Sequence, residues 1–152
     1  MIVYRLAKER FKNDLSGKGA EIAGGRWNSK GVAVLYTSES RALCTTEIAV
    51  HTPLGILPDD FYLITIDIPD NIEIKEIKAT QLPENWKNIP HINDTQQTGN
   101  KFIKEKKFLV LKVPSAVVQG DYNYLLNPAH KDFEKIKIKK TEKFEFDKRL
   151  FK

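Results

Sequence analysis

Short runs of β-branched and aromatic residues recur along almost the whole chain, and they constrain its fold more than any other feature. The runs alternate apolar with polar residues or end at Pro, Asn or other polar residues, as strands of a half-buried sheet do. The sequence therefore predicts a large sheet, with strands at residues 2–6, 32–36, 61–68, 72–77, 108–113 and 136–146. The last of these is expected to be a half-exposed strand or a bulged hairpin.

One helix is predicted between the second and third strands, over residues 39–51. Ser38 is a candidate N-cap because a serine oxygen can accept a hydrogen bond from a free N–H of the first turn. Glu39 in that turn suits the positive end of the helix dipole. Thr52 and Pro53 then end the helix, since the residue before a proline is biased away from helical backbone angles.

A second helix is predicted over residues 95–107, with Asp94 as its cap. Phe102 would supply an apolar contact, whereas Gly99 weakens the prediction because glycine is a poor helix former. No internal repeat or low-complexity linker divides the chain. Together the elements predict a single α+β domain over residues 1–152 with a mixed or antiparallel sheet.

Length and composition narrow the class of protein. A chain of 152 residues is long enough to bury one sizeable core, and no apolar run approaches the roughly 20 residues of a membrane-spanning helix. The first residues lack the apolar stretch of a secretory signal. Cys44 is the only cysteine, which agrees with a reducing compartment. These features predict a cytoplasmic protein without a membrane association.

The net charge of +5 raises the question of nucleic-acid binding. Residues 131–152 carry +4 of it, whereas residues 1–130 carry only +1. A nearly neutral body disfavours a broad face that follows phosphates, and the basic residues of the tail fit the solvated side of a strand. A basic nucleic-acid-binding module remains the rival interpretation, resting on Lys135, Lys137, Lys139 and Lys140 near aromatic residues.

The segment 17–31 is rich in glycine and carries Arg26, Trp27 and Lys30 just before a predicted strand. Glycines allow a backbone to approach a ligand closely, and an arginine offers a planar fork of donors to phosphate oxygens. The segment equally fits a structural connection, with Trp27 as a core residue. It has neither a Walker A ending nor a G-x-G-x-x-G pattern, which excludes the common nucleotide-binding loops.

Glu47 is an acid on the predicted core-facing stripe of the first helix, four residues after Leu43 and three before Val50. An exposed position on a rotated helix is the alternative for an isolated glutamate. Tyr36 ends the strand that leads into this helix, so its ring and the carboxylate are expected to converge near one edge of the sheet. This pair marks a candidate site.

Ser115 follows a proline at the end of a predicted strand, where a serine commonly has a turn or capping role. Residues 123–130 mix amides, an aromatic residue and a histidine in a predicted tight loop, in which Asn127 is a candidate ligand-binding residue. The three histidines lack the surroundings of a hydrolase triad. They are also too scattered for a zinc site, so no metal is expected.

Several segments, read in order, resemble the RES domain of bacterial toxin-antitoxin systems. The resemblance covers almost the whole chain, and it is carried by Gly-Gly-Arg-Trp-Asn-Ser-Lys-Gly at 24–31, Leu-Tyr-Thr-Ser-Glu-Ser-Arg-Ala-Leu at 35–43, Glu47, Val-Pro-Ser-Ala-Val-Val at 113–118 and Asn-Tyr-Leu-Leu-Asn-Pro at 123–128. The residues that name the family correspond here to Arg26, Glu47 and Ser115. Ser29 stands where proline is common in the family.

This resemblance implies an ADP-ribosyltransferase-like core that consumes NAD by hydrolysis or phosphorolysis. Some relatives instead modify a protein target, so mono-ADP-ribosyltransferase activity is the alternative. The implied partner is an Xre-type antitoxin that covers the NAD cleft. An inactive protein whose cleft only docks a regulator is a third interpretation. Whether the free chain forms a homodimer stays open.

Hypothetical roles follow for the site residues. Glu47 would stabilise positive charge on the ribose during cleavage of the nicotinamide-ribose bond. Arg26 would bind the pyrophosphate with help from Lys30. Tyr36 would stack near the nicotinamide, and Ser115 would orient the dinucleotide. The catalytic residues are therefore predicted to be Glu47, Arg26 and Ser115, and the NAD-binding residues Arg26, Tyr36, Lys30, Ser115 and Asn127.

Overall fold

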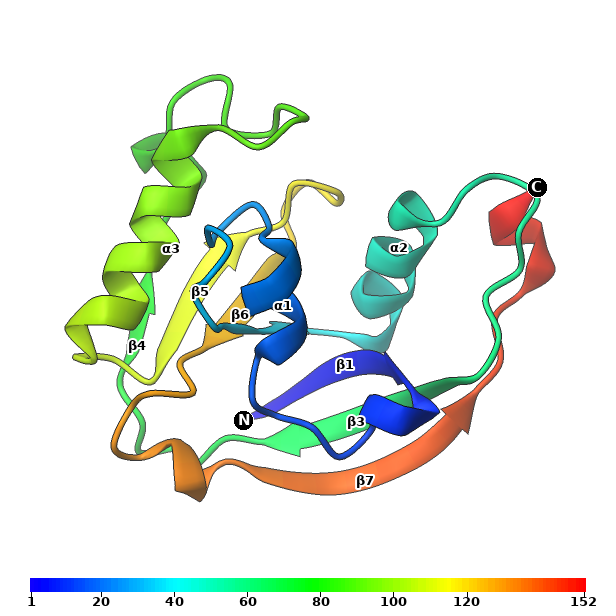
Figure 1. Ribbon diagram of the computed structural model, residues 1–152, viewed down its shortest axis with the longest axis horizontal. Coiled ribbons are helices and arrows are strands. Elements are labelled where there is room, and N and C mark those ends of the chain that lie inside the picture. The colour runs from blue at the N-terminus through cyan, green and yellow to red at the C-terminus, as the bar shows by residue number, and fades with distance from the viewer.

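A seven-stranded mixed sheet forms the body of the protein in the computed structural model, which describes all residues 1–152 (Figure 1). Neighbouring strands are antiparallel except for β4 and β5, which are parallel. The predicted α+β class with a mixed sheet is confirmed. In spatial order the strands are β4 (Ile74–Glu76), β5 (Val110–Pro114), β6 (Tyr122–Leu126), β2 (Leu35–Ser38), β1 (Ile2–Lys8), β3 (Phe61–Asp67) and β7 (Lys137–Phe144).

The basic tail forms the edge strand β7, which pairs antiparallel with β3 and has a register shift opposite Thr65 and Ile66. This confirms the predicted strand in the tail. Ile136 at its start is buried and belongs to the core, whereas the lysines along β7 are mostly exposed. The charge of the tail is thus spread along one solvated edge of the sheet.

The prediction of a tight loop over residues 123–130 is wrong for its first half, because Tyr122–Leu126 is the strand β6. This strand pairs with β2 on one side and with β5 on the other. Leu125 and Leu126 are completely buried. The pairing partners come from segments far away in the sequence, so tertiary contacts override the local preference of asparagine for turns.

Helix α2 (Arg41–His51) begins two residues later than predicted, and its N-cap is Ser40 instead of Ser38. The Ser40 Oγ accepts a hydrogen bond from the Leu43 N–H at 3.0 Å. Ser38 is a buried residue of β2, where its backbone takes part in strand pairing. The carboxylate of Glu39 accepts a hydrogen bond from the Tyr122 N–H at 2.9 Å and so ties the start of the helix to β6.

Helix α3 (Asn93–Glu105) confirms the second predicted helix but not its cap. Asp94 lies within the first turn, and no side chain caps the helix. Phe102 is buried beneath α3 in a cluster that also contains Trp27 and Trp86. The remaining helices are α1 (Lys18–Ala23) and four short 3-10 helices at Glu9–Phe11, Ala79–Gln81, Phe133–Lys135 and Lys148–Phe151.

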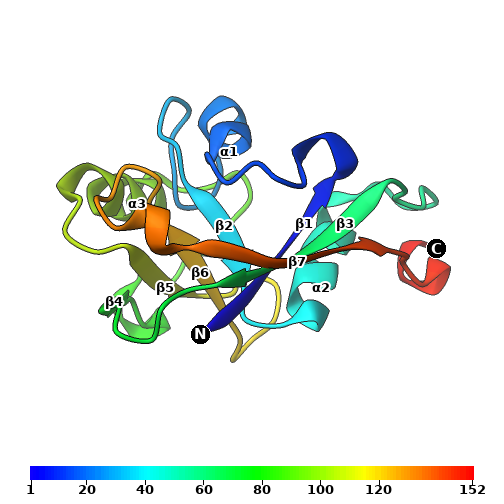
Figure 2. The ribbon, with the colours of Figure 1, turned by 90° about the horizontal axis from the view of Figure 1, so that it is seen from below.

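The helices are distributed along the length of the molecule. Figures 1 and 2 both place α3 and α2 toward opposite ends, with α1 between them. None of the three α-helices combines the length and the apolar character that crossing a membrane requires. Helix α2, which carries Glu47, contacts β1 and β2 near the middle of the sheet.

Candidate active site

The carboxylate of Glu47 is the meeting point of three segments. Its Oε1 accepts a hydrogen bond from the Asn123 Nδ2 at 3.0 Å and another from the Ser115 Oγ at 3.3 Å. Glu47 comes from α2, Ser115 from the end of β5 and Asn123 from the start of β6. The half-buried acid is thus held in one position by two neutral donors, with its second carboxylate oxygen free of such contacts within the protein.

Ser115 is fixed more firmly than a surface serine, because it is 2% exposed and its hydroxyl both donates and accepts hydrogen bonds. Its Oγ accepts hydrogen bonds from the N–H groups of Val117 and Val118 at 3.1 and 3.0 Å. The hydroxyl proton is therefore left to point toward Glu47. This geometry agrees with the positional role that the sequence indicates for Ser115.

Arg26 lies in the electrostatic field of Glu47 without forming an ion pair with it. Burial lowers the pKa of the Arg26 guanidinium, while the negative charge of Glu47 and then the phenol of Tyr36 act in the opposite direction. The Nη1 of Arg26 donates to the backbone carbonyls of Trp86 and Asn88, at 2.6 and 3.2 Å. Its Nη2 and Nε make no hydrogen bond within the protein, so they remain available to a ligand.

Tyr36 organises the loop that carries Arg26. Its hydroxyl donates to the Asn28 Oδ1 at 2.6 Å and accepts from the Trp27 N–H at 3.1 Å. Burial raises the pKa of the phenol, so the hydroxyl stays protonated near neutral pH. Tyr36 is the second residue of β2 and not its last, which corrects the sequence prediction. The structure nevertheless brings Tyr36 close to Arg26.

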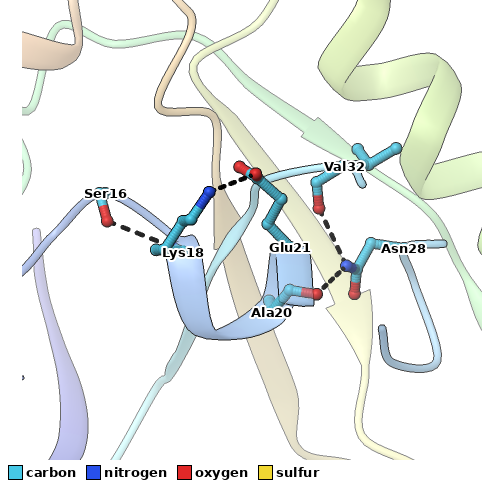
Figure 3. A network of polar contacts seen from close by, with 6 residues as sticks. All are labelled: Ser16, Lys18, Ala20, Glu21, Asn28 and Val32. Atoms are coloured by element: carbon cyan, nitrogen blue, oxygen red, sulfur yellow. Dashed lines mark hydrogen bonds and ion pairs between the residues drawn. The ribbon is translucent and has the colours of Figure 1, made fainter. Parts of the chain in front are cut away.

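Asn28 is a residue of this loop that the sequence interpretation overlooked. It is completely buried, and its Nδ2 donates to the carbonyls of Ala20 and Val32 at 2.8 and 3.0 Å (Figure 3). These bonds tie α1 to the loop and to the segment before β2. The glycine-rich segment is therefore a tightly bonded structure that presents Arg26, and buried amides, not only glycines, give it its shape.

Two close packing contacts of the Arg26 loop require glycine, one at Gly25 in the loop and one at Gly99 in α3. A Cβ on Gly25 would lie 2.8 Å from the Tyr36 hydroxyl, and a Cβ on Gly99 would lie 1.6 Å from the carbonyl oxygen of Trp27. Gly99 lets α3 pack directly against the backbone of the Arg26 loop. Gly99, which weakened the helix prediction from the sequence, is thus required by the packing of the fold.

Two histidines near Arg26 were also missed. Burial lowers the pKa of His91, and the neighbouring charges of Arg26 and His51 lower it further. The Nδ1 of His91 is sealed from solvent and has no hydrogen-bond partner. The two histidines lie far apart in the sequence and belong to no motif, so only the fold could reveal that His91 lies near both Arg26 and His51.

Lys30 and Asn127, predicted to bind NAD, are not brought to Glu47 by any contact. Lys30 is exposed and makes no ion pair. Asn127 is completely buried, with its Nδ2 donating to the Ile103 carbonyl and its Oδ1 accepting from the Ala129 N–H, at 3.1 and 3.0 Å. Its amide shapes a turn at the other end of β6, so nothing in the geometry supports a role in binding.

The buried face of α2 also differs from the core-facing stripe predicted from the sequence. Leu43 and Cys44 are the buried residues of α2, whereas Val50 is 56% exposed. Burial raises the pKa of the Cys44 thiol to about 12, which leaves it a packing residue and not a nucleophile. Glu47 is thus half-buried because of its bonds to Ser115 and Asn123, not because a continuous apolar stripe includes it.

The fold and this site together define a class of protein: a small α+β protein in which an acid on a helix, a serine after a strand and an arginine loop converge. The chain belongs to the RES domain family, since residues 2–147 match the model of that family, described as RES domain. The contact between Glu47 and Ser115, with Arg26 in electrostatic reach, joins the three residues that the resemblance singled out.

Individual proteins support this assignment. The chain is 39% identical over 142 residues to the Prs ADP-ribosylating toxin of Sphingobium sp. (strain YBL2), covering 92% of this chain and 88% of that protein. It is 37% identical to a Toxin Res of Photorhabdus laumondii, covering 100% and 98%. The crystal structure of the M. tuberculosis MbcT-MbcA toxin-antitoxin complex contains a similar fold, with a TM-score of 0.75, 20% identity and coverage of 99% and 86%.

Proposed function

We propose that this protein is the toxin of a toxin-antitoxin pair and that it cleaves the nicotinamide-ribose bond of NAD. The observation that carries the proposal is the Glu47 carboxylate, held by Ser115 and Asn123 within electrostatic reach of Arg26. The name of one similar protein, an ADP-ribosylating toxin, supports NAD as the substrate, and the name Toxin Res supports the role of toxin.

The chemistry of the bond explains what a fixed carboxylate contributes. When the bond between nicotinamide and ribose breaks, nicotinamide leaves as a neutral molecule and positive charge develops on the ribose, as in the oxocarbenium-like transition state of glycosidases. A carboxylate near the ribose stabilises that charge, and this stabilisation is strongest when the group is already in place. The two hydrogen bonds to the Glu47 Oε1 provide such preorganisation.

Arg26 is the proposed binding residue for the pyrophosphate. Its Nη1 is anchored to two backbone carbonyls, so the guanidinium is held in place while Nε and Nη2 stay free to bind a ligand. An arginine fork matches the oxygens of a phosphate group better than a single ammonium does. The ring of Tyr36 is proposed to pack near the nicotinamide, Ser115 to position Glu47 and the dinucleotide, and Lys30 to add a charge at the rim.

The acceptor of the ADP-ribose distinguishes two candidate functions. Transfer to water or phosphate would make the protein an NAD glycohydrolase or phosphorylase. Transfer to a protein is favoured by one specific observation, the similarity to a toxin named for ADP-ribosylation. In both cases the proposed partner is an antitoxin, which the toxin-antitoxin complex known for the similar M. tuberculosis fold supports. We propose further that this antitoxin is of the Xre type and covers the site.

Nicotinamide release is the direct test of the proposal. We expect the purified chain, free of antitoxin, to convert NAD to nicotinamide and to an ADP-ribose product whose identity depends on the acceptor. Free ADP-ribose would indicate hydrolysis, a product formed only with added phosphate would indicate phosphorolysis, and label from NAD attached to proteins of a cell extract would indicate transfer. Intact NAD under all three conditions would rule out the proposed activity.

The role of Arg26 gives a separate prediction. A lysine at this position offers three donors at one point, so it cannot keep both backbone carbonyls and also bind a pyrophosphate. Arg26→Lys is therefore expected to raise the KM for NAD about tenfold, as the loss of one charged hydrogen bond would, with a smaller change in kcat. Steady-state nicotinamide release measures both constants. Arg10→Lys is the matched control, because Arg10 is exposed and its side chain makes no hydrogen bond or ion pair.

An unchanged KM in Arg26→Lys would remove Arg26 from the binding of NAD. A fall in kcat alone would instead assign it to the transition state, since that pattern marks an interaction made only there.

A further inference from the structure

A polar hollow of about 200 Å³ lies away from Glu47, which is not among the residues that line it. It is formed by the segment between α3 and β5, the segment before β4 and the loop that follows β6. Asn123 contacts Glu47 at the start of β6, whereas the hollow lies beyond the other end of that strand. The charged and histidine residues among those that line it are Glu73, Lys107, His130, Lys131, Asp132 and Lys135.

His130 lines this hollow and has one ring nitrogen without a partner in the protein. Its side chain is only 7% exposed, and its Nδ1 accepts a hydrogen bond from the Asp132 N–H at 3.0 Å. In a neutral imidazole one nitrogen accepts and the other donates, so the proton is on Nε2. No group of the protein accepts a hydrogen bond from Nε2. It is not one of the two sealed, unpartnered side-chain atoms of the chain, so it keeps contact with solvent.

The lysines give the hollow a surplus of positive charge. Lys135 pairs with the Asp132 Oδ1 at 3.0 Å, which neutralises one of the three ammonium groups. Lys107 lies over the ring of Phe108, at 5.4 Å from its centroid, and forms no ion pair. Lys131 has no carboxylate partner either. Glu73 is the only other acid among the lining residues, so the local charge remains positive.

An N–H donor without a protein partner, with unpaired ammonium groups nearby, matches an anion that has several acceptor oxygens. The volume sets the size of that anion. Sites for drug-sized ligands occupy about 300–1,000 Å³, so a hollow of about 200 Å³ suits a smaller group. We propose that this hollow binds a phosphate group, supplied either as inorganic phosphate or as the monoester of a small sugar. The proposal is independent of NAD cleavage.

The proposal also gives part of the basic tail a specific role. Lys131 and Lys135 are the tail residues that line the hollow, whereas Lys139 and Lys140 lie further along the exposed edge strand β7. A compact site for one phosphate group requires none of the lysines of β7. It therefore differs from the nucleic-acid face considered from the sequence, which would use the lysines along the whole strand.

The test is a phosphate titration followed at the His130 imidazole nitrogens by NMR, at constant pH and ionic strength. We expect a saturable change at His130. The double variant Lys107→Gln with Lys131→Gln should weaken this binding at least tenfold, about the effect of losing one charged hydrogen bond. Lys139→Gln with Lys143→Gln removes the same charge outside the hollow and should change the affinity less than about twofold, since exposed charges at a distance are screened.

Two ligands distinguish the sources of the phosphate group. Tighter binding of ribose 5-phosphate than of inorganic phosphate would assign the hollow to a sugar phosphate, and equal or weaker binding would assign it to the free ion. No saturation at His130 up to roughly 10 mM of either ligand, ten times a millimolar Kd, would overturn the proposal. Equal weakening by the two double variants would overturn it too, because it would mean general attraction by the tail. The readout at His130 does not depend on NAD cleavage.

Discussion

Glu47→Gln is expected to lower the rate of nicotinamide release from NAD by about 10²–10³, the range seen when a preorganised charge-stabilising group is lost from an active site. The glutamine oxygen can still accept the hydrogen bonds from Ser115 and Asn123 that the Glu47 Oε1 accepts now. The substitution therefore removes the negative charge while keeping the contacts. A loss of activity in a folded variant is then an electrostatic effect.

Two companion variants sharpen this experiment. Glu47→Asp keeps the negative charge but shortens the side chain by one methylene. It should retain more activity than Glu47→Gln if the charge matters more than its position. Glu134→Gln removes an exposed acid near the other end of the sheet and should leave the rate unchanged. Circular dichroism and thermal unfolding check that each variant is folded. A Glu47→Gln protein with near-normal turnover would show that the carboxylate does not stabilise the reacting ribose.

The strands that the sequence predicts best are those whose local pattern agrees with their burial. Residues 61–68 were expected as a strand because apolar and β-branched residues dominate there, and β3 lies between β1 and β7 with Leu63, Ile64 and Ile66 completely buried. In such a segment the local preference and the tertiary environment favour the same conformation, and the prediction succeeds.

The errors lie where a distant segment decides the structure. Asn123 and Tyr124 have the composition of a turn, yet they form a strand because β2 and β5 flank them on both sides. Ser38 is a good capping residue, but its pairing with Asn123 extends β2 by two residues and moves the cap to Ser40. Neither pairing can be read from the residues near these positions.

In the candidate site, too, contacts between distant segments could not be predicted from local sequence patterns. Glu47 and Ser115 are 68 positions apart, and it was the resemblance to a family, not any local pattern, that joined them before the structure placed them in contact. Asn123 was left out, although it makes the shorter hydrogen bond to Glu47. Asn127 was chosen in its place from the same run, since an asparagine that binds a ligand and one that shapes a turn look alike in a sequence.

Gly99→Ala is expected to destabilise the protein by about 3 kcal/mol or more, at the upper end of the range for overpacked cores. The new Cβ would lie 1.6 Å from the carbonyl oxygen of Trp27. The Cβ is fixed to the helix backbone and the oxygen is itself a backbone atom, so neither can rotate away. Helix α3 and the Arg26 loop must then separate. For a chain of this length, the midpoint of thermal unfolding should fall by about 6–12 °C.

Gly19→Ala is the matched control, because Gly19 also lies in a helix but a Cβ there meets nothing within 4 Å. Alanine should stabilise that position by about 0.5–1 kcal/mol through its better helix propensity. The contrast tests the contact between α3 and the loop, since both variants make the same chemical change. Arg26 lies in the loop that the new Cβ would displace. Gly99→Ala should therefore also weaken NAD binding at temperatures below the unfolding of the variant. A Gly99→Ala protein as stable as Gly19→Ala would mean that α3 does not pack directly on the Trp27 backbone.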